Sequence, residues 1–289
     1  MINTLILHAS IFHADDVFVA AMATILNPQV KIIRTFDVRN YDLDSDDDIV
    51  VCDIGGGRFD HHGEPKLRED GHKHCAATLF WERFGHDIVH KIAPEMDENG
   101  IDITFNTIDH KLLSTIAGLD NGDIKTSLYT INAVISSFNA SWDNPGSADS
   151  GFASAVQIAL LVLTNEIQRS ASVDRGKKIV QKAIAESTDR IVVLPQFAPW
   201  QTYVCATDAQ VIVFPSNRGG FNMQLVPVKP GVFDTRISTP ESWHGKSGEE
   251  AAAEFDGMNF CHASGFMAAF STLEQALKAA HYLVDTNNN

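Results

Sequence analysis

Residues 4–26 read TLILHASIFHADDVFVAAMATIL and decide the fold of the N-terminal half. Thr4–His8 is a short apolar run that predicts a strand ending in a histidine. Apolar residues recur with helical spacing over Asp15–Leu26, which predicts a helix. Two further apolar runs, Val30–Arg34 and Ile49–Asp53, predict a second and a third strand. This order of strand and helix indicates a βαβ unit with a parallel sheet.

The predicted secondary structure changes twice after these strands. Residues 76–187 read as mostly helical, with a loop at 139–151 between helix pairs. After Ile191–Leu194, apolar runs between turn residues predict three more strands. These strands are Thr202–Ala206, Gln210–Phe214 and Phe221–Val228. We therefore expect an α/β protein with one domain over residues 1–190 and a smaller α+β domain over residues 191–289.

Two helices are expected in the last part of the chain. Each is opened by a capping-box pattern, in which a serine is followed three residues later by a glutamate. The pattern occurs as Ser247-x-x-Glu250 and as Ser271-x-x-Glu274.

The composition is typical of a soluble globular protein. Of the 289 residues, 44% are hydrophobic and 20% are charged, which allows a sizeable core. The longest apolar run, Ala153–Thr164, is interrupted by Ser154 and Gln157 and indicates a buried helix, short of the roughly 20 apolar residues of a membrane span. The N-terminus lacks a basic leader. We expect a cytoplasmic protein with no membrane partner.

The net charge and the cysteines limit the possible functions. A net charge of −15 argues against a protein that coats long nucleic acid, because such binding needs a broad basic surface. An enzyme for short oligonucleotides or phosphate esters remains possible, since bound cations would add positive charge where the substrate approaches. The cysteines form no C-x-x-C pair, which indicates reduced, buried thiols. They are Cys52, Cys75, Cys205 and Cys261.

Side chains able to bind metal follow two of the predicted strands. His8 ends the first strand and Asp53 ends the third. Ligands of parallel α/β sheets bind beyond the carboxyl ends of the strands, so these side chains are expected to lie together. The loop after His8 adds His13 and Asp15, which gives the spacing H-x4-H-x-D. The pattern predicts a metal site at this edge of the sheet.

Two later segments add candidate ligands. A glycine-rich turn precedes Asp60-His61-His62, and Asp120 ends a predicted helix. Imidazole together with carboxylate suits Mn²⁺, Fe²⁺, Co²⁺ or Zn²⁺, whereas Mg²⁺ prefers oxygen ligands. Two ions about 3.5–4 Å apart can activate a water and neutralise the oxygens of a phosphodiester. A carboxylate fixed at a strand end, such as Asp53, is well suited to bridge them.

Some of these residues also have an ordinary structural interpretation. His8 could be a hydrogen-bonded residue at a strand end. Asp120 with Asn121-Gly122 could be the turn that terminates a helix. The contiguous Asp60-His61-His62 makes a metal site the stronger interpretation of the whole set.

In this order the motifs resemble motifs I to IV of the DHH phosphoesterase superfamily, and more closely the melanocyte-proliferating-gene (MYG-type) exonuclease family. The closer resemblance rests on FHAD at 12–15, DIGG at 53–56 and FDHH at 59–62, and on FDTR at 233–236, WHG at 243–245 and HASGF at 262–266. It covers nearly the whole chain. It implies a DHH-type metal-binding catalytic domain over residues 1–190 and a C-terminal substrate-binding domain over residues 191–289.

The resemblance also implies a division of the ligands between two ions. One ion would be held by His8, His13 and Asp53. The other would be held by Asp15, Asp53, His61 and Asp120, with Asp53 bridging. Much of the superfamily has an aspartate in the place of His13, and the histidine makes the site less negative. We expect two Mn²⁺ ions, with Mg²⁺, Co²⁺ or Zn²⁺ as alternatives.

The catalytic residues implied by the resemblance are Asp53, Asp60, His61 and His62. His62 would face the substrate phosphate. Asp60 would hydrogen-bond a neighbouring histidine and support it.

The late motifs would form the substrate side of the site. Arg236 would bind a phosphate in bidentate fashion, and His262 with the Ser264-Gly265 backbone would bind a phosphate or a terminal hydroxyl. A tight turn between a strand and a helix explains Ser264-Gly265 equally well. Trp243 either stacks on a base or packs the second domain, and we favour packing.

The function implied is hydrolysis of phosphodiester bonds, as a 3′-to-5′ exonuclease on RNA or short single-stranded oligonucleotides. The residues alone argue only for phosphoester hydrolysis. The acidic balance favours a rival, a small-molecule phosphohydrolase for a cyclic dinucleotide, a nucleotide or pyrophosphate. A nucleotide-binding module without catalysis is a third alternative, against which the intact ligand set argues. A homodimer is compatible with the sequence.

Overall fold

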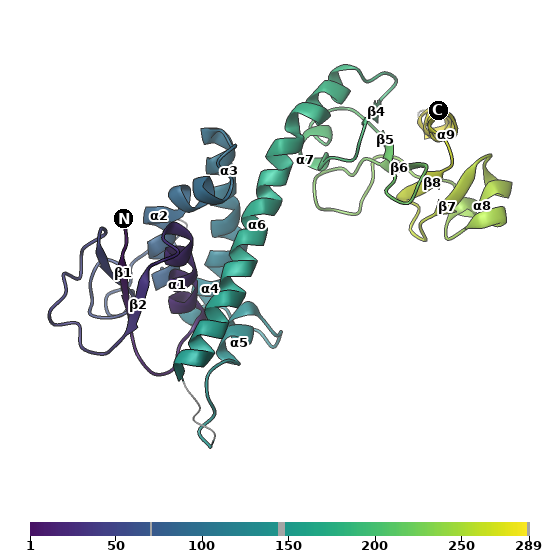
Figure 1. Cartoon of the computed structure of the whole chain (residues 1–289). Coiled ribbons are helices and arrows are strands. Elements are labelled where there is room, and N and C mark those ends of the chain that lie inside the picture. The colour runs from purple at the N-terminus through teal and green to yellow at the C-terminus, as the bar shows by residue number, and fades with distance from the viewer. Residues whose placement is uncertain (70, 144–147, 288–289) are drawn as a thin grey trace. The chain divides into compact units, whose positions relative to one another are not determined.

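The computed structural model describes residues 1–69, 71–143 and 148–287 (Figure 1). The chain forms two compact units, Met1–Ala171 and Ser172–Asn289. They divide inside one long helix, α6 (Ala148–Ala185). The division after Ala171 therefore lies N-terminal to the domain boundary near residue 190 that was predicted from the sequence. The roles predicted for the two domains stay predictions.

The N-terminal unit is built on a three-stranded parallel sheet, which confirms the predicted βαβ arrangement. Its order is β2-β1-β3, formed by β1 (Thr4–Leu7), β2 (Lys31–Arg34) and β3 (Ile49–Val51). In the parallel register Leu7 lies opposite Arg34 and Ile6 lies opposite Val51. All three strands therefore end at the same edge of the sheet.

The third strand is shorter than predicted. It ends at Val51, and the chain then turns so that the backbone N–H of Asp53 donates to the carbonyl of Phe59 at 3.0 Å. Asp53 has a φ of +59°, in the left-handed region that non-glycine residues seldom adopt. Asp53 therefore lies in a turn and not in the strand, and its hydrogen bond to Phe59 closes the loop that leads to Asp60.

Helices cover the sheet and confirm the mostly helical interpretation of residues 76–187. They are α1 (Ala14–Leu26), α2 (Ala76–Ile92), α3 (Glu98–Ile108), the π-helical turn η1 (Asp109–Leu113), α4 (Ser114–Asp120), α5 (Ile131–Ser136) and the first part of α6. The helix α1 packs closely on α2, and its alanines and valines are buried on every side. Small side chains allow this close approach.

The loop predicted at 139–151 lies partly outside the described residues, because 144–147 are not described. The described chain is helical again from Ala148, so α6 begins before the expected end of the loop. The stretch Asp149–Ala185 of α6 is long and apolar enough to cross a membrane by length and composition alone. Core helices of soluble proteins meet the same criterion, so this finding carries no argument.

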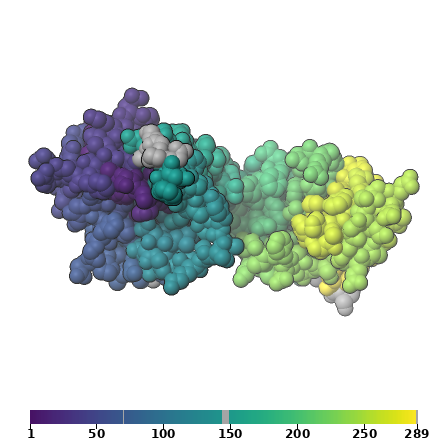
Figure 2. Space-filling model, turned by 90° about the horizontal axis from the view of Figure 1, so that it is seen from below, coloured from purple at the N-terminus to yellow at the C-terminus, as the bar shows by residue number. Residues whose placement is uncertain are grey.

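The C-terminal unit is built on a mixed five-stranded sheet. The strand order is β4-β5-β6-β8-β7, and only the pair β4–β5 is parallel among the pairs described. The strands are β4 (Ile191–Val193), β5 (Val211–Pro215), β6 (Phe221–Leu225), β7 (Met258–Cys261) and β8 (Met267–Phe270). The last helix, α9 (Leu273–Asn287), lies against β5, β6 and β8, and its outer side is at the surface (yellow in Figure 2).

One of the strands predicted for this unit was wrong. Thr202–Ala206 lies largely in a short helix, α7 (Gln201–Val204), where the N–H of Val204 donates to the carbonyl of Trp200 at 2.9 Å. Trp200 and Val204 are both buried, and their spacing of four residues follows the helical period. The strand predicted over Phe221–Val228 ends at Leu225.

The two predicted capping boxes also need correction. Ser247 does precede α8 (Gly248–Glu254), but its side chain makes no capping hydrogen bond. At α9 the capping residue is Thr272, whose Oγ1 accepts from the N–H of Gln275 at 3.3 Å. The pairing lies one residue after the predicted Ser271-x-x-Glu274, because the helix itself begins at Leu273.

Two side-chain predictions for the apolar interior are confirmed. Trp243, at the end of the 3₁₀ turn η2 (Glu241–Trp243), is 2% exposed and lies against the rings of Phe255 and Tyr282, so it packs the unit. The thiols of Cys52, Cys75 and Cys261 are buried. Cys205 is half-buried, and like the others it is free of disulfides.

Arg236 is an internal anchor of the C-terminal unit. Its Nη1 donates to the carbonyls of Thr207 and Ala209, and its Nη2 donates to the carbonyl of Cys205, each at 2.6 Å. A half-buried guanidinium thus closes the turn between α7 and β5. This geometry gives Arg236 a structural role, and its contact with a phosphate stays a prediction.

The substitution Arg236→Ala should destabilise the C-terminal unit by about 2–4 kcal/mol, because three carbonyl groups lose a charged hydrogen-bond donor. Urea denaturation followed by circular dichroism measures this change. Arg218→Ala, at an exposed arginine after β5, is the matched control and should change the stability by less than about 0.5 kcal/mol. Equal unfolding midpoints for the two variants would contradict the structural role.

Candidate metal centre

The carboxylate of Asp53 lies between two histidines. Its Oδ2 is 3.3 Å from Nε2 of His8, which follows β1. Its Oδ1 is 3.2 Å from Nε2 of His61. The two oxygens of Asp53 therefore face different histidines, as a carboxylate that bridges two ions must do.

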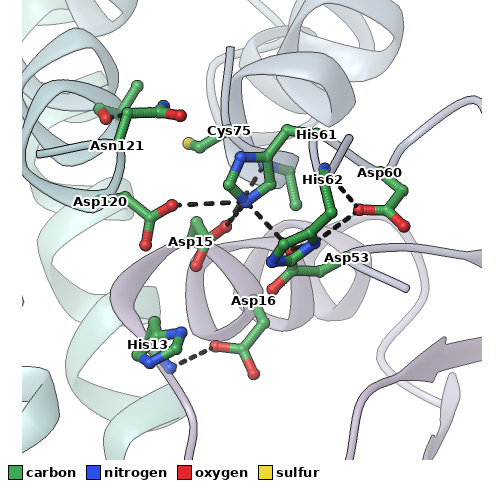
Figure 3. A network of polar contacts seen from close by, with 12 residues as sticks. His13, Asp15, Asp16, Asp53, Asp60, His61, His62, Cys75, Asp120 and Asn121 are labelled. Carbon is green, nitrogen blue, oxygen red and sulfur yellow. Dashed lines mark hydrogen bonds and ion pairs between the residues drawn. The ribbon is translucent and has the colours of Figure 1, made fainter. Parts of the chain in front are cut away.

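His61 brings together the residues predicted for the second ion. Its Nε2 lies 3.4 Å from Oδ2 of Asp15 and 3.4 Å from Oδ2 of Asp120, besides its approach to Asp53 (Figure 3). These residues come from the N-terminus of α1, the loop after β3 and the end of α4. One imidazole nitrogen thus faces three carboxylates from separate parts of the sequence.

His8 forms the other side of the cluster. Its Nδ1 lies 2.9 Å from the carbonyl of Ala9, and because a carbonyl only accepts, Nδ1 carries the proton. The lone pair of the neutral ring is then on Nε2, which lies 3.3 Å from Asp53 and 3.4 Å from Oδ2 of Asp16. Asp16 was not predicted from the sequence. The only local signal for it was a second acidic residue in the first turn of a helix, which is ordinary capping chemistry.

His13 lies apart from the group in which it was predicted. Its ring is exposed and its centroid is 5.9 Å from that of His8. One potential ligand atom of His13 lies within 4.8 Å of ligand atoms of Asp15 and Asp120. His13 was predicted to share an ion with His8 and Asp53, but its potential ligand atom lies with those of Asp15 and Asp120 instead.

The buried oxygens of this cluster fit divalent cations. Oδ1 of Asp15, Oδ2 of Asp16 and Oδ1 of Asp53 accept no hydrogen bond from any described residue. Asp15 and Asp16 are fully buried, and Asp53 is 2% exposed. Burying carboxylate oxygens without a partner is unfavourable unless a cation compensates them. With imidazole nitrogens on both sides, the donors suit Mn²⁺, Co²⁺ or Zn²⁺.

The same contacts shift the pKa values of the two histidines. The contact with Asp53 raises the pKa of His8 to about 9. Burial disfavours the charged form of His61, but Asp15 and Asp53 outweigh this effect and raise its pKa to about 10. Without metal, both imidazoles are therefore protonated at neutral pH and stand in for cations.

The carboxylates respond in opposite directions. Burial and then the neighbouring Asp15 raise the pKa of Asp120 to about 7 and raise that of Asp16 well above its usual range. Burial would also raise the pKa of Asp53, but His61 and His8 outweigh it and the pKa is lowered. The carboxylate at the centre therefore stays ionised.

Asp60 holds His62 and leaves its outer nitrogen open. Oδ1 of Asp60 lies 2.8 Å from Nδ1 of His62 and accepts from its backbone N–H at 3.0 Å. Oδ2 accepts from the N–H of Gly56 at 2.6 Å. The side chain of His62 is 64% exposed, whereas that of His61 is 10% exposed. Both histidines therefore lie beside carboxylates, but His61 is enclosed by them, whereas His62 approaches Asp60 and Asp53 with Nδ1 and exposes the rest of its ring to solvent.

The helix end beside Asp120 supports both interpretations made from the sequence. The side chain of Asn121 donates to the carbonyls of Ala117 and His74, each at 3.0 Å, and Gly122 has a φ of +72°. The segment is thus a helix-terminating turn. The same turn presents the Asp120 carboxylate to His61.

The residues predicted for substrate binding in the C-terminal unit form a turn. His262, Ser264 and Gly265 connect β7 to β8, so the turn joins two strands where a strand and a helix were expected. Nδ1 of His262 accepts from the N–H of Ser264 at 3.1 Å. Gly265 has a φ of +72°, and a Cβ there would lie 2.2 Å from Nε2 of His244. The tight-turn interpretation is confirmed, and contact with substrate stays a prediction.

Comparisons with known proteins cover almost the whole chain. The family model for MYG1 exonuclease, described as an uncharacterised protein family (UPF0160), matches residues 4–284. A MYG1 protein of Schizosaccharomyces pombe is 26% identical over 98% of this chain and 97% of its own length. MYG1 exonuclease of Rattus norvegicus is 26% identical over 94% of the chain and 82% of its own length, and that of Homo sapiens is 24% identical over 94% and 83%. No solved structure matches.

Binding of divalent metal should become tighter as the pH rises. The pKa of His8 is about 9 and that of His61 about 10, so each ring must lose a proton before it can bind an ion. The apparent affinity for each ion should rise by about tenfold per pH unit between roughly pH 7 and 8, and more steeply below pH 7 for the ion beside Asp120, because that carboxyl must then also lose a proton. Calorimetric titration of EDTA-treated protein with Mn²⁺, in buffers of different ionisation enthalpy, measures both the affinity and the protons released. Affinity that does not change with pH would contradict this view of the site.

Proposed function

The chain belongs to the MYG1 exonuclease family, and from this premise we propose that it is a divalent-metal-dependent phosphodiesterase. The reaction we propose is stepwise 3′-to-5′ removal of nucleotides from RNA or short single-stranded oligonucleotides. The family match and the mammalian relatives named MYG1 exonuclease support a nuclease-type function. The observation that supports metal dependence is the set of buried carboxylate oxygens without hydrogen bonds between His8 and His61.

The proposed ion sites follow the two halves of the cluster. His8 and Asp53 would contribute to one site. Asp15, Asp53, His61 and Asp120 would hold the other, with Asp53 shared. When bound, divalent ions supply activation of a water and neutralisation of charge on the phosphate oxygens. The mixture of nitrogen and oxygen donors favours Mn²⁺, with Mg²⁺, Co²⁺ and Zn²⁺ as competitors.

His62 would act on the substrate directly. Because the Asp60 carboxylate only accepts, Nδ1 of His62 carries a proton and donates a hydrogen bond to Asp60. In the neutral ring the exposed Nε2 would accept a proton from a water, and when Nε2 is protonated it would donate to a phosphate oxygen or to the oxygen that leaves. Asp60 fixes the tautomer and the orientation of this ring, as second carboxylates do for histidines in many hydrolytic sites.

The acidic character of the chain favours a second candidate. A net charge of −15 leaves little basic surface to follow a long strand, so a small phosphorylated substrate is a rival. A cyclic dinucleotide, a nucleotide or pyrophosphate would meet the same ion sites. The two candidates share their chemistry and differ in the length of the chain that the protein must hold.

Degradation of 5′-labelled RNA and DNA oligomers with Mn²⁺ tests the proposal. A 3′-to-5′ exonuclease should give a ladder of labelled products that shorten by single nucleotides, because the label stays at the retained end. Addition of EDTA, or the substitution Asp53→Ala, should abolish the ladder. Asp102→Ala, at an aspartate whose side chain is 64% exposed and pairs with His86, should leave it unchanged.

A metal-loaded protein that leaves every oligomer intact would exclude the nuclease. Opening of a cyclic dinucleotide to a linear product, or release of phosphate from a nucleotide or pyrophosphate, under the same conditions would then establish the small-molecule alternative. If none of these substrates is hydrolysed, the remaining alternative is a nucleotide-binding module without catalysis.

Asp60→Asn should lower kcat by roughly 10–100-fold while leaving the number of bound ions unchanged, because it loosens His62 without removing a ligand. Rates and metal content are measured on the same preparation. His62→Ala should lower kcat at least as much, and the double variant should lose little more, since both residues act through one ring. Additive losses in the double variant would show that Asp60 does not act through His62.

A further inference from the structure

Asp16 is a buried carboxylate that lies outside the motifs described above. Its side chain is fully buried, although it lies in the first turn of α1. Its Oδ1 accepts from the backbone N–H of His13 at 2.9 Å. Its Oδ2 accepts no hydrogen bond from the described residues and lies 3.4 Å from Nε2 of His8. One oxygen thus closes the start of the helix, as Figure 3 shows, and the other lies toward His8.

Helix capping alone does not account for the second oxygen. A carboxylate in the first turn of a helix contributes roughly 0.3–1 kcal/mol when it is exposed to solvent. Burial of an oxygen without a partner, close to the carboxylates of Asp15 and Asp53, is unfavourable by more than this gain. A cation held between Asp16, His8 and Asp53 would compensate that oxygen directly.

The distances between potential ligand atoms also group Asp16 with His8 and Asp53. Atoms of His8, Asp16 and Asp53 lie within 4.8 Å of one another. Atoms of His13 fall within that limit together with Asp15 and Asp120 instead. The ring of His13 is also exposed, whereas Asp16 is buried against His8. The geometry thus places Asp16, and not His13, beside the His8–Asp53 pair.

We propose that Asp16 takes the place of His13 as the third protein ligand of the ion held by His8 and Asp53. The inference rests on the proposed function, since it assumes that the cluster binds divalent ions. It changes this site from two imidazoles and one carboxylate to one imidazole and two carboxylates. Oxygen-rich sites suit Mn²⁺ and Mg²⁺ better than Zn²⁺. The neighbours Asp15 and Asp16 would then serve different ions.

The substitution Asp16→Asn separates the two roles of this side chain. It keeps an oxygen that can accept from the N–H of His13, but it removes the negative charge. EDTA-treated protein is titrated with Mn²⁺, and the signal of the free ion is followed by electron paramagnetic resonance. We expect the unmodified protein to bind two ions and Asp16→Asn to bind one of them at least about tenfold more weakly.

Combined variants identify which ion is affected. His8→Ala should weaken the same ion, so adding Asp16→Asn to it should cost little further affinity. Adding Asp16→Asn to His61→Ala should weaken both ions. His13→Ala should leave the ion at His8 bound as in the unmodified protein. Asp97→Asn is the matched control, because Asp97 caps α3 by accepting from the N–H of Gly100 at 2.7 Å and lies outside the cluster.

The outcomes separate this inference from the proposed function. Two tightly bound ions in Asp16→Asn, or loss of the His8 ion in His13→Ala but not in Asp16→Asn, would overturn the role of Asp16 and leave the enzyme proposal intact. No binding of Mn²⁺ by the unmodified protein would overturn both. Thermal unfolding without metal checks the fold, and Asp16→Asn should be at least as stable as the unmodified protein because it removes a buried charge. Asp16→Ser replaces it in the titrations if the asparagine variant does not fold.

Discussion

The crowding of like charges at one edge of a small parallel sheet is the constraint on which the N-terminal unit depends. Asp15, Asp16 and Asp53 are at most 2% exposed, and each keeps an oxygen that accepts no hydrogen bond from the described residues. Repulsion and loss of hydration oppose such an arrangement. The imidazole of His8 faces the oxygen of Asp16 and that of His61 faces the oxygen of Asp53, which supplies part of the compensation. A cluster of this kind could hold cations and contributes little as packing.

The scaffold holds this cluster from several directions. Strand ends fix the backbone near His8 and Asp53, and the N-terminus of α1 contributes its dipole to the buried carboxylates. The side chain of Asn139 accepts from the N–H of Phe12 at 3.0 Å and donates to its carbonyl at 2.8 Å, which ties the loop before α1 to the segment after α5. Because this support consists of strands, helix ends and paired backbone groups, the candidate ligands are held in place without an ion.

The sequence predicted the parts of this molecule that depend on local pattern. The parallel sheet followed from apolar periodicity, and the approach of His8 and Asp53 followed from the rule that strand ends share one edge. The place of His61 beside Asp53 was implied by the family resemblance. Asp16 could not be found in this way, because an acid in the first turn of a helix looks the same whether it is solvated or buried. Thr202–Ala206 was mistaken for a strand for a similar reason. A short apolar run fits a strand or a helix equally well, and only the burial of both Trp200 and Val204 in the folded unit favours the helical turn.

The charge balance of the cluster links the Asp16 assignment to substrate binding. Two divalent ions carry four positive charges, and the ionised carboxylates of Asp15, Asp16, Asp53 and Asp120 would match them when both histidines are neutral. A neutral centre attracts a phosphodiester less strongly than a positive one, so a further donor must help to hold the substrate. The exposed ring of His62, whose Nδ1 lies 2.8 Å from Asp60, would be such a donor next to Asp53 when its Nε2 carries a proton. If Asp16 binds an ion, the protein therefore relies more on His62, and less on excess metal charge, to draw the phosphate into place.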